Sequence, residues 1–310
     1  MAVPQRIVSL LPGSTEILCA LGLEARLVGV SPSCDYPGIL AQVPRLTSAT
    51  PVGSAPPGPA AAEQAIIQAS LSTEMLDLPL LRQLQPDLIV TQAPEATDGA
   101  LPSSVLEATR RYLGTPVEVL VLHPTLLQDI WDMIYLLGQV TSHTAQAATL
   151  LDELFARVNP LVAESIRLPP PRVAVLSQCA PLQVAGYWLP DMIQIAGGTA
   201  GLSQAGQPAQ QISWQQLLSY APEVLLVMPH DTSLTQLRDL LPALQAQPGW
   251  QDIPAVQHGQ AYAVDGRVSC YRPGPRIVDG LELLAGLMHP EVFGDFVETQ
   301  PRAYVPIMAS

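Results

Sequence analysis

Two segments far apart in the sequence follow the same pattern, and this repeat limits the folds that the chain can adopt. Leu81–Gln92 reads "LRQLQPDLIVTQ" and Leu217–Pro229 reads "LLSYAPEVLLVMP". Each has a helical stretch, then a proline, an acidic residue and an apolar run without alternation. Such runs are typical of parallel strands buried on both faces. The repeat therefore predicts helix-strand units of an α/β protein, although a turn proline is common in that class.

Further segments complete two series of strands and helices. We expect a helix over Ser14–Leu21 closed by Gly22, and another from about Leu78. Later helices are expected through Met192–Ala196 and around Trp214–Tyr220. The strands of the first series are "RIVSLLP", "RLVGVS", "DLIVTQ" and "VEVLVL", and those of the second are "RVAVLS", "EVLLVM" and "QAYAVD". The run "ATPVGSAPPGPAAAEQA" (residues 49–65) predicts a surface loop or flap rather than core.

A long helical segment separates the two series. Apolar residues recur at helical spacing from Thr125 to Ile166, with an interruption at "TSHT", until three prolines end the pattern at Pro169–Pro171. We predict an N-terminal α/β lobe over residues 1–124, a segment 125–171 with one long interlobe helix, and a C-terminal α/β lobe over 172–310. Mainly parallel central sheets and a ligand cleft between the two similar lobes follow from this arrangement.

Charge and cysteine usage exclude several classes of function. The formal net charge is −13, and the 14 basic residues are all arginines scattered along the chain, so no basic patch for nucleic acid is expected. No apolar run is long enough to predict membrane insertion. The four cysteines are widely spaced and form no CxxC pair, which argues against a zinc or redox site; Cys19 is interpreted as a small buried hydrophobe.

The first strand-to-helix turn, "SLLPGSTEI" (Ser9–Ile17), is a typical seat for an anion or a catalytic serine. A phosphate loop needs a lysine, which the chain lacks, and neither GxGxxG nor GxSxG is present at this turn. We interpret Ser14 as the helix N-cap, with Glu16 favourable to the helix dipole. The turn is still expected to present backbone N–H groups at the carboxyl edge of the sheet.

No arrangement of side chains predicts catalysis or a metal site. The five histidines form neither HxxxH nor HExxH, no carboxylate pair stands out, and His230 is interpreted as a loop residue that could line the cleft. The aromatic residues are more informative, because Tyr36, Tyr187, Trp188 and Tyr271 all follow strand ends. Together they suit a large, flat, partly apolar ligand.

Several motifs in order along the chain resemble one known family. They are "RIVSLLPGSTEILCALGLEARLVGVSPSCDYP", "LQPDLIVTQ", "GYWLPDMIQIAGG", "PAVQHGQAYAVDG" and "RPGPRIVDGLELLAGLMHPE". The sequence looks like the cobalamin-binding branch of the periplasmic-binding-protein family for vitamin B12, iron-siderophore and haem uptake. The resemblance implies two lobes joined by a long helix and a corrinoid lying flat between them, with its cobalt not necessarily ligated by protein. The residues that it implies as ligand contacts are Pro12, Gly13, Ser14, Tyr36, Ser48, Gln92, Cys179, Tyr187, Trp188, Gln211, Tyr271 and Arg272.

Two features depart from the family pattern. Transport members dock on a membrane permease through a surface glutamate on each lobe, whereas the equivalent positions here lie near Pro79 and Gln215, with Glu74 and Asp77 the nearest acids. Relatives without a signal peptide often carry a cysteine pair after "VTQ", whereas this chain reads "APEATDG".

The leading hypothesis is a non-enzymatic corrinoid binder for cobalamin or pseudocobalamin, with no catalytic cofactor and an ABC permease as a possible partner. The first alternative is a haem, tetrapyrrole or ferric-siderophore binder of an ABC importer, and the second is a corrinoid-processing enzyme or cofactor chaperone. The start "MAVPQRIVSL" has no signal-peptide pattern, so we expect a cytoplasmic protein, or a periplasmic one if a signal peptide precedes it.

Overall fold

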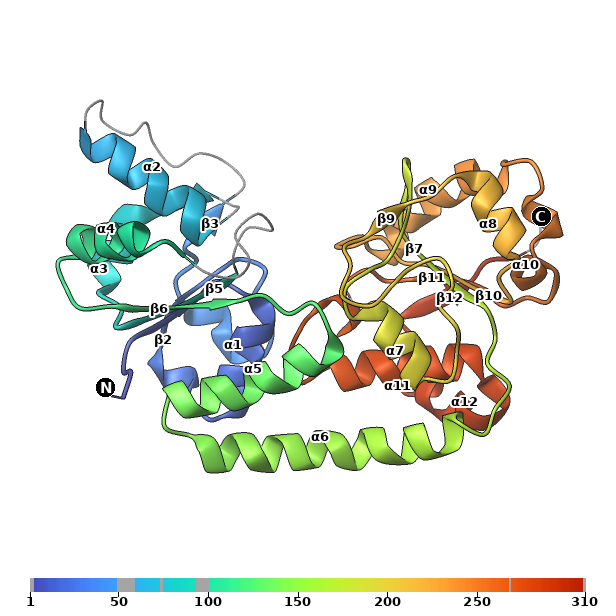
Figure 1. Cartoon of the computed structure of the whole chain (residues 1–310), viewed down its shortest axis with the longest axis horizontal. Helices are drawn as coiled ribbons and strands as arrows, with labels where there is room; N and C mark the ends of the chain where they lie inside the picture. The colour runs from blue at the N-terminus through green and yellow to red at the C-terminus, as the bar shows by residue number, and fades with distance from the viewer. Residues whose placement is uncertain (1–2, 49–58, 73–74, 93–100, 268, 309–310) are drawn as a thin grey trace. The chain divides into compact units, whose positions relative to one another are not determined.

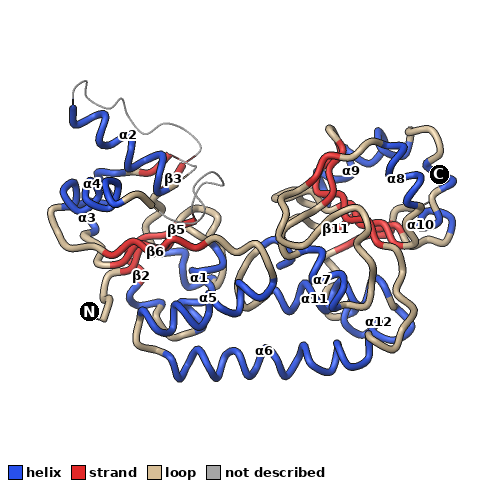
Figure 2. Tube along the Cα trace, in the orientation of Figure 1, coloured by secondary structure: helices blue, strands red, loops and turns tan. Residues whose placement is uncertain are grey.

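The architecture of the chain is that of two α/β lobes. The computed structural model describes residues 3–48, 59–72, 75–92, 101–267 and 269–308. Unit 1 comprises Met1–His123 and Asp129–Asp152, and unit 2 comprises Pro124–Gln128 and Glu153–Ser310. In each unit, helices cover both faces of a sheet (Figures 1 and 2). The predicted fold class is thereby confirmed, while the domain boundaries predicted at residues 124 and 171 stay predictions.

The sheet of unit 1 is parallel throughout. It contains β1 (Ile7–Ser9), β2 (Leu27–Val30), β5 (Leu88–Gln92) and β6 (Glu118–Leu122) in the order β2-β1-β5-β6. Ile7, Val8 and Ile89 are fully buried, because helices cover both faces. A separate antiparallel pair joins β3 (Thr47–Ser48) to β4 (Met75–Leu76).

Helices α2 (Pro59–Leu71), α3 (Leu78–Leu84) and α4 (Ser103–Leu113) lie on one face of this sheet, and α1 (Pro12–Ala20) and α5 (Leu127–Val140) lie on the other (Figure 1). Ile67 of α2 and Leu81 of α3 pack with Val8 and Ile89 in one core cluster. The expected loop over residues 49–65 is wrong from Pro59 onward, where α2 begins. Proline is favourable in the first turn of a helix and alanine is the strongest helix former, so "PAAAEQA" starts a helix.

The helical segment between the series consists of two helices. Helix α5 is followed by α6 (Thr144–Ser165), and the residues between them include most of the "TSHT" interruption. Helix α6 ends before Pro169–Pro171, as predicted. Its first part belongs to unit 1 and its part from Glu153 onward to unit 2, so one continuous helix runs from one unit into the other.

The sheet of unit 2 has a parallel centre and antiparallel edges. Its order is β12-β11-β10-β7-β8-β9, in which β7, β10 and β11 pair in parallel. Strands β8, β9 and β12 are antiparallel additions that the sequence did not indicate. The bounds are β7 (Val173–Cys179), β8 (Leu182–Val184), β9 (Gln210–Gln211), β10 (Val224–Val227), β11 (Ala261–Val264) and β12 (Tyr304–Pro306).

The helices of unit 2 form two layers. Figure 1 shows α8, α9 and α10 over one face of the sheet and α7, α11 and α12 over the other. Short 3-10 helices occur at Glu24–Arg26, Gly38–Gln42, Trp250–Asp252 and Ser269–Tyr271. The α-helices are α7 (Leu189–Ile195), α8 (Trp214–Tyr220), α9 (Leu234–Gln245), α10 (Pro254–Gln257), α11 (Ile277–Met288) and α12 (Pro290–Glu298).

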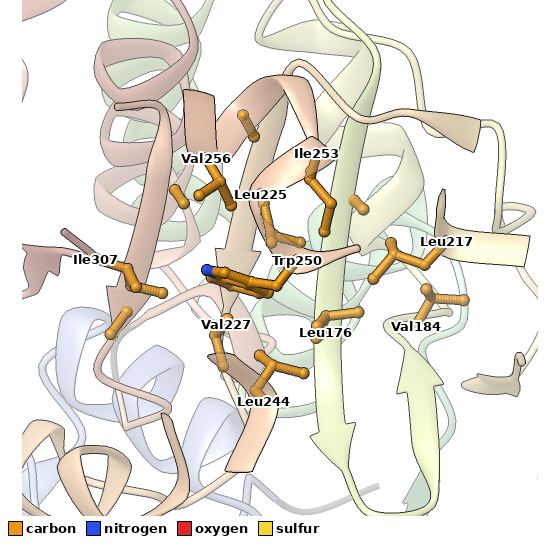
Figure 3. Packing of buried hydrophobic residues seen from close by; sticks show 14 of the residues in the cluster. Leu176, Val184, Leu217, Leu225, Val227, Leu244, Trp250, Ile253, Val256 and Ile307 are labelled. Carbon is orange, nitrogen blue, oxygen red and sulfur yellow. The ribbon is translucent and has the colours of Figure 1, made fainter. Parts of the chain in front are cut away.

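Trp250 is at the centre of the larger core cluster. Its side chain is 1% exposed and lies among Leu176 of β7, Leu225 and Val227 of β10, and Leu244 of α9 (Figure 3). The indole also lies stacked on Trp214, with ring centroids 6.4 Å apart. Trp250 therefore packs the α8–α10 layer on the sheet together with residues of the helices themselves, such as Leu217 of α8 and Val256 of α10.

The repeated segments form the same structure in both units. The C-cap of α3 is Gln85, with φ 44°, and Pro86 then leads into β5. The C-cap of α8 is Ala221, with φ 49°, and Pro222 then leads into β10. The left-handed residue terminates each helix, and the buried proline that follows it prevents continuation.

An arginine that precedes the first strand of each unit binds the end of this helix. In unit 1, Arg6 Nε and Nη2 donate to the carbonyl of Leu84 at 2.9 and 2.6 Å. In unit 2, Arg172 Nε and Nη2 donate to the carbonyl of Ala221 at 3.0 and 2.9 Å. The arginine thus ties the helix C-terminus to the amino end of the neighbouring strand in each unit.

Candidate functional site

The turn after β1 differs in detail from the predicted one. The N-cap of α1 is Leu11, which makes no side-chain cap, and Ser14 is already inside the helix. The N-cap interpretation of Ser14, and with it the first-turn position of Glu16, is therefore wrong. Pro12 supplies the first helical residue, where its missing N–H costs nothing, so the helix begins earlier than expected.

This turn still presents backbone donors. The hydrogen bond back to the N-cap runs from the Thr15 N–H to the carbonyl of Leu11 at 3.1 Å. The N–H groups of Gly13 and Ser14 come before that bond, where an α-helix has no acceptor of its own. Gly13 and Ser14 are buried and Pro12 is half-buried. The Ser14 hydroxyl donates to the carbonyl of Leu11 at 2.9 Å, so its side chain points into the protein.

The other candidates of unit 1 also lie toward the carboxyl edge of its sheet. Tyr36 lies in the turn that follows β2 and is 47% exposed. Gln92 is the exposed last residue of β5, and Ser48 is the half-buried last residue of β3. The segment that leads to Ser48 runs beside the end of β2, because the Leu46 N–H donates to the carbonyl of Val30 at 2.9 Å.

In unit 2, Cys179 and two aromatic residues follow strands. Cys179 is the last residue of β7, half-buried, and burial raises the pKa of its thiol. Tyr187, in the loop before α7, has φ 53° and is held through its N–H by the carbonyl of Gln207 at 2.6 Å. Its ring stacks on that of Trp188 at 6.2 Å. Trp188 is buried, and its Nε1 donates to the carbonyl of Cys270 at 2.7 Å.

Tyr271 lies at the carboxyl end of β10. Its hydroxyl donates to the carbonyl of Met228 at 2.6 Å, and its ring meets that of His230 edge-on at 5.2 Å. Burial raises the pKa of Tyr271 well above its usual range. His230 itself is a solvated loop residue, with its side chain 62% exposed and Nδ1 3.3 Å from Asp231 Oδ2.

The last two candidates of unit 2 have different surroundings. Gln211 is exposed on the edge strand β9, where it pairs with Gln183 of β8. Arg272, beside Tyr271, is half-buried. The structure thus places six of the predicted contacts in unit 1 and six in unit 2, as two sets that we call the edge sets. The unit 1 edge set is Pro12, Gly13, Ser14, Tyr36, Ser48 and Gln92, and the unit 2 edge set is Cys179, Tyr187, Trp188, Gln211, Tyr271 and Arg272.

Sequence reasoning missed an ion pair at the end of β11. Arg267 Nε and Nη2 donate to the two carboxylate oxygens of Asp265 at 2.9 and 2.7 Å. Burial of Asp265 raises its pKa, but the hydrogen bonds and charge of Arg267 outweigh that effect and lower the pKa below its usual value. The sequence signal for this ion pair was an aspartate directly after a strand, followed two residues later by an arginine.

The two positions at which transport members carry a docking glutamate lie at the surface in this structure. Pro79 and Gln215 are exposed near the N-termini of α3 and α8. Asp77 is the N-cap of α3, and its Oδ1 accepts a hydrogen bond from the Leu80 N–H at 2.9 Å. Glu74 lies outside the described residues.

A hollow of about 590 Å³ lies elsewhere in unit 2. Ser165, Ile166, Asp191 and Thr199 are among its lining residues, and none of the predicted contacts is. Thr199 accepts the N–H of Val173 at the amino end of β7, so the hollow is at the opposite end of that strand from Cys179.

Within the described residues, no group of three or more His, Cys, Asp and Glu side chains is arranged to hold a metal ion. No helix in that part of the chain is both long and apolar enough to cross a membrane.

Comparison with known families identifies the class. The model of the periplasmic binding protein family matches residues 7–268, and the chain belongs to that family. This confirms the resemblance drawn from the motifs.

Individual relatives are distant but cover almost the whole chain. A vitamin B12-binding protein of Vibrio vulnificus is 24% identical over 90% of this chain and 88% of its own length. An uncharacterized ABC transporter substrate-binding lipoprotein, YvrC of Bacillus subtilis, is 21% identical over 94% of this chain and 82% of its own. The crystal structure of a periplasmic heme binding protein from Pseudomonas aeruginosa superposes with a TM-score of 0.66 at 21% identity, covering 93% of this chain and 94% of that one. The chain is thus a solute-binding protein of the periplasmic binding protein family, similar to proteins named for vitamin B12 binding and for haem binding.

Proposed function

We propose that this protein binds a corrinoid, cobalamin or pseudocobalamin, without transforming it, and that the two edge sets contact the ligand. The observation that supports the proposal most is the chemistry of these sets. The unit 1 edge set offers early-helix N–H groups and the side chains of Ser48 and Gln92, and the unit 2 edge set offers the half-buried ring of Tyr187, which stacks on the buried Trp188. A corrin ring carries neutral amide arms around a large apolar face, which suits backbone donors combined with aromatic rings.

The relatives support the same ligand. Proteins named for vitamin B12 binding recur among those that match the chain along most of its length. An ABC importer is the proposed partner, on the basis of the substrate-binding lipoprotein relative. Neither Pro79 nor Gln215 is acidic, so we propose that docking on its permease does not use a glutamate at these two positions.

Haem is the second candidate, and the observation that favours it is the exposed imidazole of His230. Imidazole is a common axial ligand of haem iron, and a tyrosinate can also serve. Tyr271 is poorly suited to that role, because its hydroxyl donates to a backbone carbonyl and its raised pKa keeps it protonated. His230 is therefore the residue through which a haem function would operate.

Titration with cyanocobalamin and aquocobalamin tests the proposal. We expect saturable binding in calorimetry and a change in the visible spectrum, with the corrinoid recovered unchanged in mass. No binding at tens of micromolar ligand would contradict it. Titration with hemin separates the alternative, since ligation by His230 gives a shift of the Soret band that is lost in His230→Ala.

A pair of matched tyrosines tests the edge set of unit 1. Tyr36 is 47% exposed and Tyr135, on α5 and outside the edge set, is 48% exposed. We expect Tyr36→Ala to weaken corrinoid binding by about tenfold, the loss of one aromatic contact. Tyr135→Ala is the control and should bind as the unchanged protein does. Equal affinity of both variants would remove Tyr36 from the site.

A further inference from the structure

Beneath the first turn of unit 1, five small polar side chains form one buried network. They are Ser9, Ser14, Thr15, Ser31 and Cys34, each no more than 3% exposed. The Thr15 Oγ1 is central, 2.7 Å from Ser9 Oγ and 3.0 Å from Cys34 Sγ. Ser9 Oγ is in turn 2.8 Å from Ser14 Oγ, and Ser31 Oγ is 3.3 Å from Cys34 Sγ.

The network connects the turn between β1 and α1 with the turn that follows β2. Ser9, Ser14 and Thr15 belong to β1 and the first turn of α1, where Pro12 and Gly13 lie. Ser31 and Cys34 belong to the turn that follows β2 and carries Tyr36. Burial raises the pKa of the Cys34 thiol, so the group stays protonated and can donate within the network.

A second contact holds the same turn from another side. Arg45 Nη1 donates to the carbonyls of Ser31 at 3.2 Å and Cys34 at 2.8 Å, and its Nη2 donates to that of Leu40 at 3.3 Å. The turn is therefore fixed at its backbone by a guanidinium and at its side chains by the network. A displacement of the turn would leave buried hydroxyl groups without partners, which is unfavourable.

We propose that this network positions the Tyr36 turn relative to the Pro12–Gly13 turn and thereby sets the affinity for the ligand. Thr15 and Cys34 are positioning residues: both are buried, and they act through Tyr36 and the turn amides. This inference rests on the proposed function, because it takes Tyr36 and the Pro12–Gly13 turn as ligand contacts.

The chain offers a matched control for Thr15. Thr109 is also a fully buried threonine of unit 1, within α4, and its Oγ1 donates to the carbonyl four residues earlier, that of Val105, at 2.8 Å. Thr15 Oγ1 is likewise 3.1 Å from the carbonyl four residues earlier, that of Leu11. The two threonines differ in one respect: Ser9 Oγ and Cys34 Sγ also lie within hydrogen-bond distance of Thr15 Oγ1.

The experiment compares Thr15→Val and Thr109→Val by thermal unfolding and by titration with cyanocobalamin. We expect both to lower the Tm, and Thr15→Val alone to weaken binding, by about tenfold. Thr15→Ser keeps the hydroxyl and should restore the affinity. The proposal fails if a folded Thr15→Val binds as tightly as the unchanged protein, or if Thr109→Val loses as much affinity. Cys34→Ala, which also breaks the network, replaces Thr15→Val if that variant does not fold.

Hydrogen exchange separates this proposal from the proposed function. Without ligand, Thr15→Val should speed amide exchange in residues 31–40, whereas Thr109→Val should not. If the unchanged protein binds no corrinoid, the proposed function fails and the exchange result still decides whether the network positions the turn. Unchanged exchange in Thr15→Val would overturn the positioning role even if a corrinoid binds.

Discussion

The two units are alike at the amino ends of their sheets and differ at the carboxyl ends. At the amino end, Arg6 binds the C-terminal end of α3 in one unit and Arg172 binds that of α8 in the other. At the carboxyl end of unit 1, the turn after β1 lies over the buried hydroxyl groups of Ser9 and Thr15. The same end of unit 2 carries the aromatic side chains of Tyr187, Trp188 and Tyr271. The repeated segments therefore build the scaffold of both units, while the loops at the carboxyl ends differ in their polar and aromatic side chains.

The acidic residue that follows the repeated proline differs between the units by one methylene group. Asp87 accepts the N–H groups of Gln5 and Arg6 on its two oxygens at 2.8 and 2.9 Å. The longer Glu223 accepts the Arg172 N–H at 2.9 Å and lies 3.5 Å from the same residue's guanidinium. The aspartate therefore binds two backbone amides, and the glutamate replaces one of them with an exposed ion pair.

The largest effect is expected at Trp250, a large and fully buried side chain of the unit 2 core. Trp250→Ala removes the indole at the centre of the core and should lower the free energy of unfolding by about 3–5 kcal/mol, measured by urea unfolding. Leu81→Ala in the unit 1 core should cost about 2–5 kcal/mol. A Trp250→Ala protein as stable as the original would contradict the central place of Trp250 in the unit 2 core.

The next-largest effect on stability is expected at Asp87, in comparison with Glu223. Asp87→Ala leaves two backbone N–H groups without their acceptor and should destabilise by about 1–2 kcal/mol, as loss of a helix cap does. Glu223→Ala should cost less than about 1 kcal/mol, because its ion pair is exposed. Urea unfolding of both variants measures the difference, and equal losses would contradict the two-amide account.

A contribution to stability that is lost in acid is expected at the carboxyl edge of unit 2. The pKa of Asp265 is lower in the folded protein than in the unfolded chain, where an aspartate has a pKa of about 3.9. The pair therefore stabilises above about pH 4, and that contribution is lost as the pH falls through the folded pKa. We expect the urea midpoint to fall less steeply with acid in Arg267→Gln than in the original. Parallel curves would exclude the pair as an acid-sensitive element.

The smallest effect concerns thiol reactivity, which should be low in both units. Burial, followed by the nearby Glu24, raises the pKa of Cys19 to about 12, although the residue is only half-buried, not buried as expected. Burial also raises the pKa of Cys179. Both thiols should react slowly with iodoacetamide at neutral pH in the folded protein and quickly after unfolding, as followed by mass spectrometry. Rapid modification of Cys19 alone would show that the two units differ here.

Local signals predicted most of the scaffold. Helix α8 coincides with its expected span, and β5 and β10 lie within the predicted apolar runs, because buried parallel strands carry their signal in their own composition. Strands β8, β9 and β12 have no such signal, because they are short and their stability comes from pairing with distant segments. Helix α4 was missed although Val105, Ala108 and Leu113 are buried on one side of it.

The candidate site was less predictable than the scaffold. Its strand-end positions followed from the pattern, but the direction of each side chain did not. Ser14 is the clearest case, because a serine near a helix start can cap it from outside or lie within the first turn. Because Pro12 is the first residue of α1, Ser14 lies within the first turn. The contact between Thr15 and Cys34 depends on how two loops pack, which no local pattern encodes.

The choice of arginine at the amino ends has a chemical consequence. A guanidinium remains charged at every pH at which proteins are folded, whereas an ammonium group can lose its proton in alkali. Both helix-to-strand ties, at Arg6 and Arg172, are therefore insensitive to alkaline conditions that would weaken a lysine. Since the chain contains no lysine, no side chain offers a primary amine, and amine-directed labels can leave both scaffolds and both edge sets unmodified.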